Sequence, residues 1–133
     1  MIDEIIKLAV DEDAGLGDIT SENIFSPKDN SKAVFIAKDD MIICGGDIAR
    51  QVFEYVEPRV KFRMLYPDGA RVKKGGVIAR ISGPTLGLLK GERPALNFMQ
   101  RMSAVASAAY ELNLIAKKYG VMLVDTRKSL PGM

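Results

Sequence analysis

The spacing of apolar residues changes from strand-like to helical part-way along the chain, and this change most limits the possible folds. Residues 60–65 alternate apolar and polar side chains, which is typical of a half-buried strand. Residues 33–37 and 77–83 also have strand character, and glycine turns separate the runs. Across residues 86–119, apolar and small side chains recur instead at three- and four-residue steps. The sequence therefore predicts an α+β fold, with a mainly antiparallel sheet over residues 30–83 and a long helix after it.

One further helix is expected within the sheet region. Residues 33–37 and 41–44 are two β-type runs, and the polar residues between them favour a hairpin-like connection. Gly45-Gly46 ends the second run, and Asp47 is expected to cap the helix that follows. Pro58 ends this helix. Its apolar face comprises Ile48, Val52, Phe53 and Val56.

Local signals refine the helical regions. Apolar residues at helical spacing predict a short amphipathic helix over residues 2–10, and the glycines and acids of residues 11–21 are typical of an irregular loop. Within the long helix, Pro94 disfavours helical geometry at Arg93, so we expect a break or kink there. The small residues from Ser103 to Ala109 allow a second backbone to approach closely, either in ordinary helix packing or in a ligand contact.

An apolar run follows the long helix directly. Gly120 is expected to end the helix, and residues 121–124 (Val-Met-Leu-Val) have the composition of a strand buried on both faces in a parallel sheet. Such a strand needs neighbours, and none follows in the 133 residues. Either the neighbours come from another chain or the sequence is a fragment.

The composition excludes several kinds of site. The chain has no histidine, which excludes a Ser-His-Asp triad, a Cys-His pair and histidine zinc sites within it. The single cysteine, Cys44, excludes a disulfide framework and is expected to be a small buried apolar residue. The acids at 11–13 and Glu22 fit a solvated loop better than a metal site.

A net charge of +2 gives no indication of nucleic acid binding. Neither a signal peptide nor a membrane span is recognisable, so we expect a cytosolic protein.

Polar and charged residues follow the apolar run immediately, as Thr126, Arg127 and Lys128. In α/β barrels and open α/β sheets, the carboxyl ends of the strands form the active face. The planar Arg127 guanidinium can hold a carboxylate or phosphate with two hydrogen bonds, and Lys128 adds a compact charge. The pattern alone fits an anion pocket or a solvated turn. Spacing alone favours a surface pair at a helix end for Arg93 and the adjacent Glu92 over a functional role.

Four stretches of the chain form a recognisable series. They are Glu12-Asp13-Ala14-Gly15-Leu16-Gly17-Asp18-Ile19-Thr20-Ser21, the Asp68-Gly69 turn, Gly91-Glu92-Arg93-Pro94-Ala95-Leu96-Asn97 running to Arg101-Met102-Ser103, and Asp125-Thr126-Arg127-Lys128-Ser129-Leu130-Pro131-Gly132. In this order they resemble the quinolinate phosphoribosyltransferase family, and the resemblance covers nearly the whole chain. The chain departs from the family at Ala104, where glycine is common, and at Ser129 and Leu130, where two threonines are frequent.

The resemblance implies a fold and a division into domains. Residues 1–103 would form an α/β-hammerhead-like N-terminal domain that acts as a substrate lid, and residues 104–133 would begin an α/β barrel. A barrel of this general kind takes about 200 to 250 residues, so only its first strand would be present. We therefore expect the N-terminal portion of a longer enzyme, inactive alone.

The resemblance also implies a reaction, carried out by a nicotinate-nucleotide diphosphorylase (carboxylating), a pentosyltransferase of NAD biosynthesis. The family joins quinolinate to 5-phosphoribosyl 1-diphosphate and releases nicotinate mononucleotide, carbon dioxide and diphosphate, assisted by Mg²⁺. Thr126, Arg127 and Lys128 would bind the quinolinate carboxylates at the mouth of the barrel. Arg93 would reach into the site of a neighbouring subunit in a homodimer or larger homo-oligomer. The Mg²⁺ ligands would lie outside this segment.

Two other interpretations are open. A related protein of molybdate-transport operons shares the fold, although the Glu92–Asn97 stretch favours the quinolinate enzyme. Residues 66–83 superficially resemble a biotinyl or lipoyl carrier, with Lys73 or Lys74 at a hairpin tip. The carrier interpretation lacks a Met-Lys-Met or Asp-Lys-Ala tip and leaves residues 125–132 without a role.

Overall fold

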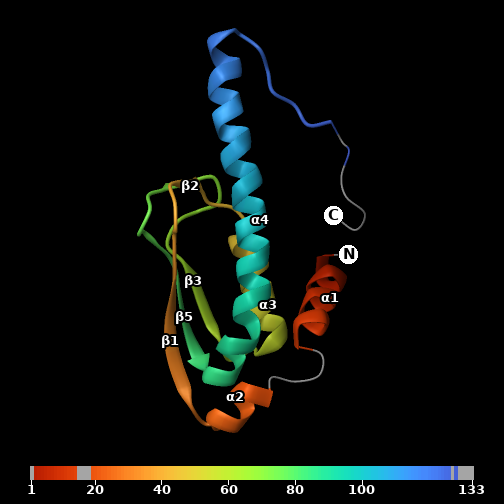
Figure 1. Cartoon of the computed structure of the whole chain (residues 1–133), viewed down its shortest axis with the longest axis vertical. Coiled ribbons are helices and arrows are strands. Elements are labelled where there is room, and N and C mark those ends of the chain that lie inside the picture. The colour runs from red at the N-terminus through yellow and green to blue at the C-terminus, as the bar shows by residue number, and fades with distance from the viewer. Residues whose placement is uncertain (1, 15–18, 127, 129–133) are drawn as a thin grey trace.

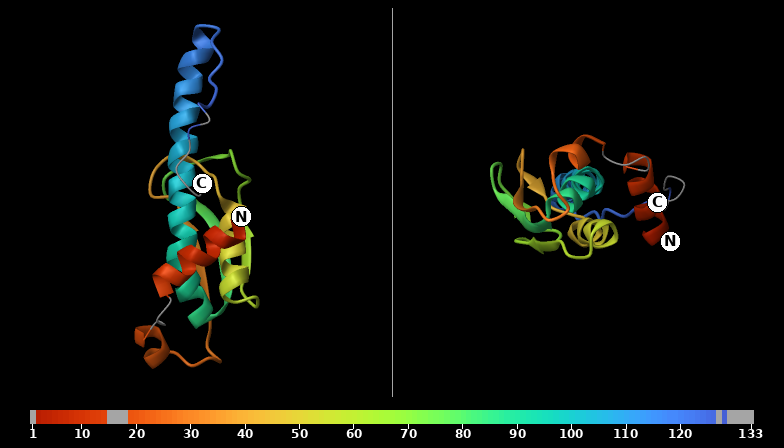
Figure 2. Two further views of the ribbon diagram at one scale, coloured as in Figure 1. Left: turned by 90° about the vertical axis from the view of Figure 1, so that its right-hand side faces the viewer. Right: turned by 90° about the horizontal axis from the view of Figure 1, so that it is seen from below.

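The computed structural model describes residues 2–14, 19–126 and 128, and it has the predicted α+β architecture (Figure 1). A sheet layer packs on helices α3 and α4, and α1 covers the other side of these two helices (Figure 2). The elements are α1 (Ile2–Ala14), α2 (Ile19–Ile24), β1 (Asn30–Ile36), β2 (Met41–Ile42), α3 (Gly46–Val56), β3 (Lys61–Met64), β4 (Arg71–Val72), β5 (Val77–Pro84) and α4 (Thr85–Lys118).

The strands form two antiparallel sheets rather than a hairpin of consecutive strands. The larger has the order β1-β5-β3, and the smaller pairs β2 with β4. The predicted hairpin between residues 33–37 and 41–44 is therefore wrong. The eight-residue β5 pairs along the whole of β1, whereas β2 has only two residues and offers fewer backbone bonds. The intervening turn is held elsewhere, because the Asp40 carboxylate accepts hydrogen bonds from Lys73 Nζ at 2.6 Å and from the Lys74 N–H at 3.0 Å.

The N-terminal region is more helical than the sequence indicates. The predicted helix over residues 2–10 is confirmed, but α1 continues to Ala14 and α2 begins at Ile19. The prediction of an irregular loop over residues 11–21 is therefore wrong where the structure describes it.

The core lies between the three-stranded sheet and the helices. Phe53, on α3, is 1% exposed. Its ring lies 6.3 Å from that of Phe35 on β1 and 5.6 Å from that of Phe62 on β3, between ring centroids. At Gly91, α4 passes so close that an added Cβ would lie 2.6 Å from Cδ1 of Phe53. Gly91 therefore serves close packing of α4 on α3.

We predicted a break or a kink at Arg93. Helix α4 runs without a break through Pro94, so the predicted break is wrong. A proline inside a helix removes one backbone hydrogen bond and costs about 3 kcal/mol. Here the proline and its neighbour Ala95 are both buried, as is Met99 one turn later. Burial of this apolar face stabilises α4 enough to offset the local cost.

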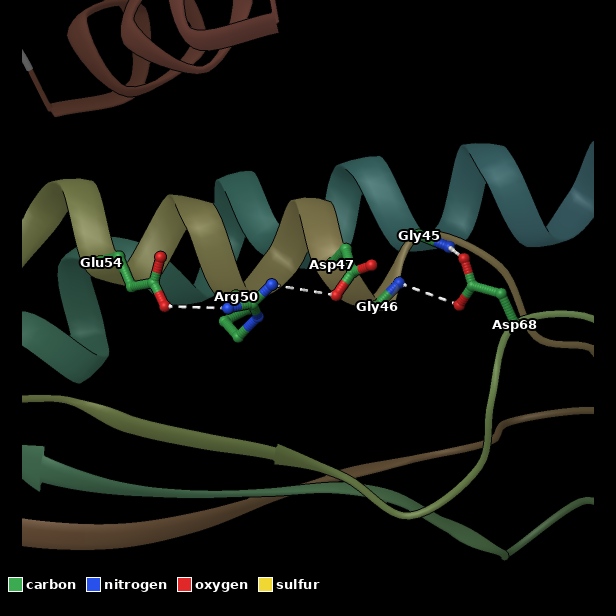
Figure 3. Close-up of polar contacts among 6 residues, drawn as sticks. All are labelled: Gly45, Gly46, Asp47, Arg50, Glu54 and Asp68. Atoms are coloured by element: carbon green, nitrogen blue, oxygen red, sulfur yellow. Dashed lines mark hydrogen bonds and ion pairs between the residues drawn. The ribbon is translucent and has the colours of Figure 1, made fainter.

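Asp68 caps α3, not Asp47 as predicted (Figure 3). The N–H groups of Gly45 and Gly46 donate to the Asp68 carboxylate, at 2.8 and 3.1 Å. Helix α3 already begins at Gly46, so Asp47 lies inside the first turn, where its side chain accepts from Arg50 Nη2 at 3.1 Å instead. Two donors at this helix N-terminus are thus satisfied from within the chain.

The small residues of α4 bring the helix against the backbone around β2. Ser103 Oγ accepts the Cys44 N–H at 2.9 Å and donates to the Cys44 carbonyl at 3.1 Å, and Ser107 Oγ accepts the Ile42 N–H at 2.9 Å. Of the two roles left open by the sequence, the structure shows helix packing against a second backbone.

We expect Ser103→Ala to lower the free energy of unfolding by about 1–3 kcal/mol, because it leaves two backbone groups of Cys44 without their partner. Urea denaturation followed by circular dichroism measures this loss. Ser107→Ala is the matched comparison, since it removes one such bond at a partly exposed position and should cost less. An equal loss in the two variants would contradict the assignment.

The C-terminal part of α4 extends beyond the sheets (Figure 1). The predicted helix end is confirmed: Gly120 has φ +66°, and the N–H groups of Val121 and Gly120 donate to the carbonyls of Ala116 and Lys117. Residues 121–124 form no strand here and their side chains are exposed. A buried parallel strand needs neighbours, which the described residues do not supply, so the barrel strand stays a prediction. None of the described helices is both long and apolar enough to span a membrane.

Candidate functional site

Arg93 lies on the exposed side of α4, in contact with α1. Its side chain is 74% exposed, and Nη1 lies 2.9 Å from Oδ1 of Asp13, whose side chain is 23% exposed. The partner of Arg93 is thus a residue 80 positions away, not the adjacent Glu92. Two of the stretches that carry the family resemblance therefore meet at this ion pair.

A hollow of about 770 Å³ lies between α1 and α4, next to this pair. Its walls are mainly apolar, from side chains such as Ile5 on α1 and Phe98 on α4. Asp13, Asn97 and Arg101 are among its polar lining residues. The arrangement places hydrogen-bonding groups beside an apolar surface, which is typical of a site that takes a small organic ligand.

The other predicted site residues lie in the segment after α4. Thr126 and Lys128 are exposed, and Arg127 lies outside the described residues. Within the described ranges, no hydrogen bond or ion pair joins Arg93 to Thr126 or Lys128. The folded chain therefore does not bring the four residues together, and their shared role in binding quinolinate stays a prediction.

No group of three or more His, Cys, Asp or Glu side chains that could hold a metal is found in residues 2–14, 19–126 and 128. The described residues therefore offer no cluster of side chains that would fit a Mg²⁺ ion.

Cys44 is half-buried beside Asp68. Burial raises the pKa of its thiol, and the negative charge of the Asp68 carboxylate raises that pKa further. A thiol that stays protonated is a poor nucleophile. The structure thus supports a packing role for Cys44, as predicted, with partial rather than full burial.

A second group of cations, which the sequence analysis missed, lies on the open face of the larger sheet. Lys32, Lys61, Arg63 and Arg80 project from the three strands, and Arg63 lies directly opposite Arg80. The signal was present in the alternation of cations with apolar residues along residues 61–64. Like charges so placed repel each other and raise the local positive potential, which attracts anions.

Comparison with known proteins gives consistent results. Residues 18–103 match a family model described as quinolinate phosphoribosyl transferase, N-terminal domain. The chain is 38% identical over 131 residues to a mitochondrial quinolinate phosphoribosyltransferase [decarboxylating] of Nicotiana tabacum, covering 98% of this chain and 37% of the relative. It is 36% identical over 122 residues to the probable nicotinate-nucleotide pyrophosphorylase [carboxylating] of Bacillus subtilis, covering 92% and 42%.

Solved structures agree with these sequence matches. The nicotinate-nucleotide pyrophosphorylase of Francisella tularensis superposes with a TM-score of 0.92 at 30% identity, over 98% of this chain and 46% of that one. A Streptococcus pyogenes structure titled NadC has the same score and identity, and covers 98% and 48%. The chain thus spans less than half the length of the proteins that it matches.

Proposed function

The chain belongs to the quinolinate phosphoribosyltransferase family, and we propose that it is the N-terminal part of an enzyme that converts quinolinate and 5-phosphoribosyl 1-diphosphate to nicotinate mononucleotide, carbon dioxide and diphosphate. The observation that carries the proposal is the family match over residues 18–103 on a fold with the α+β architecture of the solved relatives. The motif stretch Glu92–Asn97 lies within that match and favours the quinolinate enzyme over the molybdate-operon relative.

In the proposed site, fixed cations hold a pyridine diacid. Quinolinate carries two carboxylates and its co-substrate is highly anionic, so binding requires several cationic donors in one place. Arg127, Lys128 and Thr126 contact the quinolinate carboxylates. Arg93 contacts quinolinate in the site of a neighbouring subunit, and its exposure on α4 supports a role that reaches outside its own chain. This role requires at least a homodimer.

Mg²⁺ and the cellular compartment remain proposals. We propose that Mg²⁺, which would neutralise charge on the diphosphate group, is held by residues outside this chain. We also propose a cytosolic location. Some plant relatives are named as mitochondrial proteins and others as chloroplastic proteins, so the compartment varies among the relatives.

A chimaera tests the proposed function. In it, this chain replaces the matching N-terminal region of the Bacillus subtilis relative. We expect the chimaera to form nicotinate mononucleotide from quinolinate and 5-phosphoribosyl 1-diphosphate, measured by chromatography, while the 133-residue chain alone gives no product above the blank. A folded chimaera with no quinolinate-dependent product would contradict the proposal, and turnover by the purified chain alone would contradict its being only part of the enzyme.

A further inference from the structure

We propose that Asp13 is a positioning residue for Arg93, which holds the guanidinium in the orientation that receives quinolinate. This inference rests on the proposed function of Arg93. The inference is drawn from the 2.9 Å contact between Asp13 Oδ1 and Arg93 Nη1, which joins the C-terminal turn of α1 to the N-terminal third of α4. The acidic stretch at 11–13, assigned above only to a solvated loop, thereby gains a role.

Packing of α1 against the core fixes the position of Asp13. Ile6 and Val10 of α1 are buried against the core. Asp13 lies one turn after Val10, on the same helical stripe, so packing of α1 fixes the carboxylate relative to α4. The side chain of Asp13 is 23% exposed, whereas that of Arg93 is 74% exposed. Asp13 as a whole residue is exposed, but its side chain is less exposed than that of Arg93 and lies on a packed helix, so it restricts the arginine.

The contact engages only one corner of the guanidinium. In the described part of the chain, Nε and Nη2 of Arg93 make no hydrogen bond. These two atoms form one edge of the planar group. Such an edge donates two parallel hydrogen bonds to a carboxylate. An arginine side chain has about 2 kcal/mol of rotamer entropy to lose on binding. A prior contact at Nη1 reduces that loss and leaves the binding edge open.

Other charged groups near the pair do not replace Asp13. Glu12 and Arg101 line the same hollow as Asp13. Neither makes an ion pair with Arg93 or Asp13 among the residues described. The contact is thus specific to one acid and one base, and a single substitution can remove it.

The test uses the active chimaera with Asp13→Asn, which removes the charge and keeps the shape. We expect the KM for quinolinate to rise about two- to fivefold, in keeping with a partly exposed ion pair, while the KM for 5-phosphoribosyl 1-diphosphate and the melting temperature stay unchanged. Asp13→Glu, which keeps the carboxylate, should restore part of the affinity. Asp11→Asn is the matched control, because Asp11 is an exposed acid of the same helix but makes no ion pair with Arg93 among the described residues; it should behave as the parent.

A double variant separates this proposal from the proposed function. In an Arg93→Ala background, Asp13→Asn should add no further loss of quinolinate affinity. If Asp13→Asn binds quinolinate as the parent does, or more tightly, while Arg93→Ala binds it weakly, the positioning role is overturned and the proposed function stands. A further loss in the Arg93→Ala background would also overturn it. If Arg93→Ala itself has no effect, the site assignment of the proposed function fails instead.

Discussion

Arg127→Ala in the chimaera is expected to weaken quinolinate binding by about 30-fold to several thousandfold. This range corresponds to about 2–5 kcal/mol, the usual cost of removing one partner of a buried, hydrogen-bonded charge pair. The substitution leaves one carboxylate of the ligand without a donor in a site from which water is excluded. Arg93→Ala is expected to have an effect of the same kind. Isothermal titration of each variant with quinolinate measures the loss.

Two further variants make this experiment specific. Arg127→Lys keeps the charge but loses the two-pronged geometry, so it should fall between the parent and the alanine variant. Arg50→Ala is the matched control, because Arg50 lies on α3 and pairs with Asp47 and Glu54 instead (Figure 3). Unchanged quinolinate affinity in both Arg127→Ala and Arg93→Ala would remove the site assignment.

Phe53→Ala is expected to lower the free energy of unfolding by about 3–5 kcal/mol. This is a large part of the total of about 5–15 kcal/mol for a typical domain. The ring packs against Phe35 and Phe62, and α4 crosses it at Gly91, so the surroundings have little freedom to fill the cavity. Urea denaturation of the isolated chain, followed by circular dichroism, measures the change.

The same helix offers a control. Tyr55 lies on α3 but is about half exposed, so Tyr55→Ala should change stability much less. Phe53→Leu keeps most of the buried apolar volume and should lose less than Phe53→Ala, which provides a folded variant if the alanine variant is largely unfolded. Equal losses in Phe53→Ala and Tyr55→Ala would show that the core is not centred on Phe53.

The elements of this fold could be predicted from the sequence because their signals are local. Alternation along residues 60–65 and 77–83, glycine at turns and the helical steps after residue 86 all act over a few neighbouring positions. Pro94 was misleading for the opposite reason. Its local preference for a break is real, but the packing of α4 against the core overrides it.

Long-range choices could not be predicted in this way. Several strands far apart in sequence could pair with β1, and no local pattern predicts that β5 is its partner. Asp68 caps a helix from 22 residues away, where the adjacent Asp47 looked the better candidate. The contact of Asp13 with Arg93 spans 80 positions.

The same contrast between local signals and long-range contacts holds for the candidate site. The resemblance indicated Arg93, Thr126, Arg127 and Lys128. Among the residues that the structure describes, it adds a partner for Arg93, which is Asp13. In the barrel that we propose, strand neighbours on both sides of residues 121–124 would bring the other three residues together. Such neighbours are distant in sequence, so no local pattern in this chain predicts the finished site.

The unbroken course of α4 has a mechanical consequence. Residues 104–118 extend the helix by about 22 Å, at 1.5 Å per residue. This part of the helix is a stiff arm up to Lys118, whereas residues 121–126 after it form neither helix nor strand. Any change of direction between the sheet domain and a protein segment attached later would therefore have to arise after Lys118.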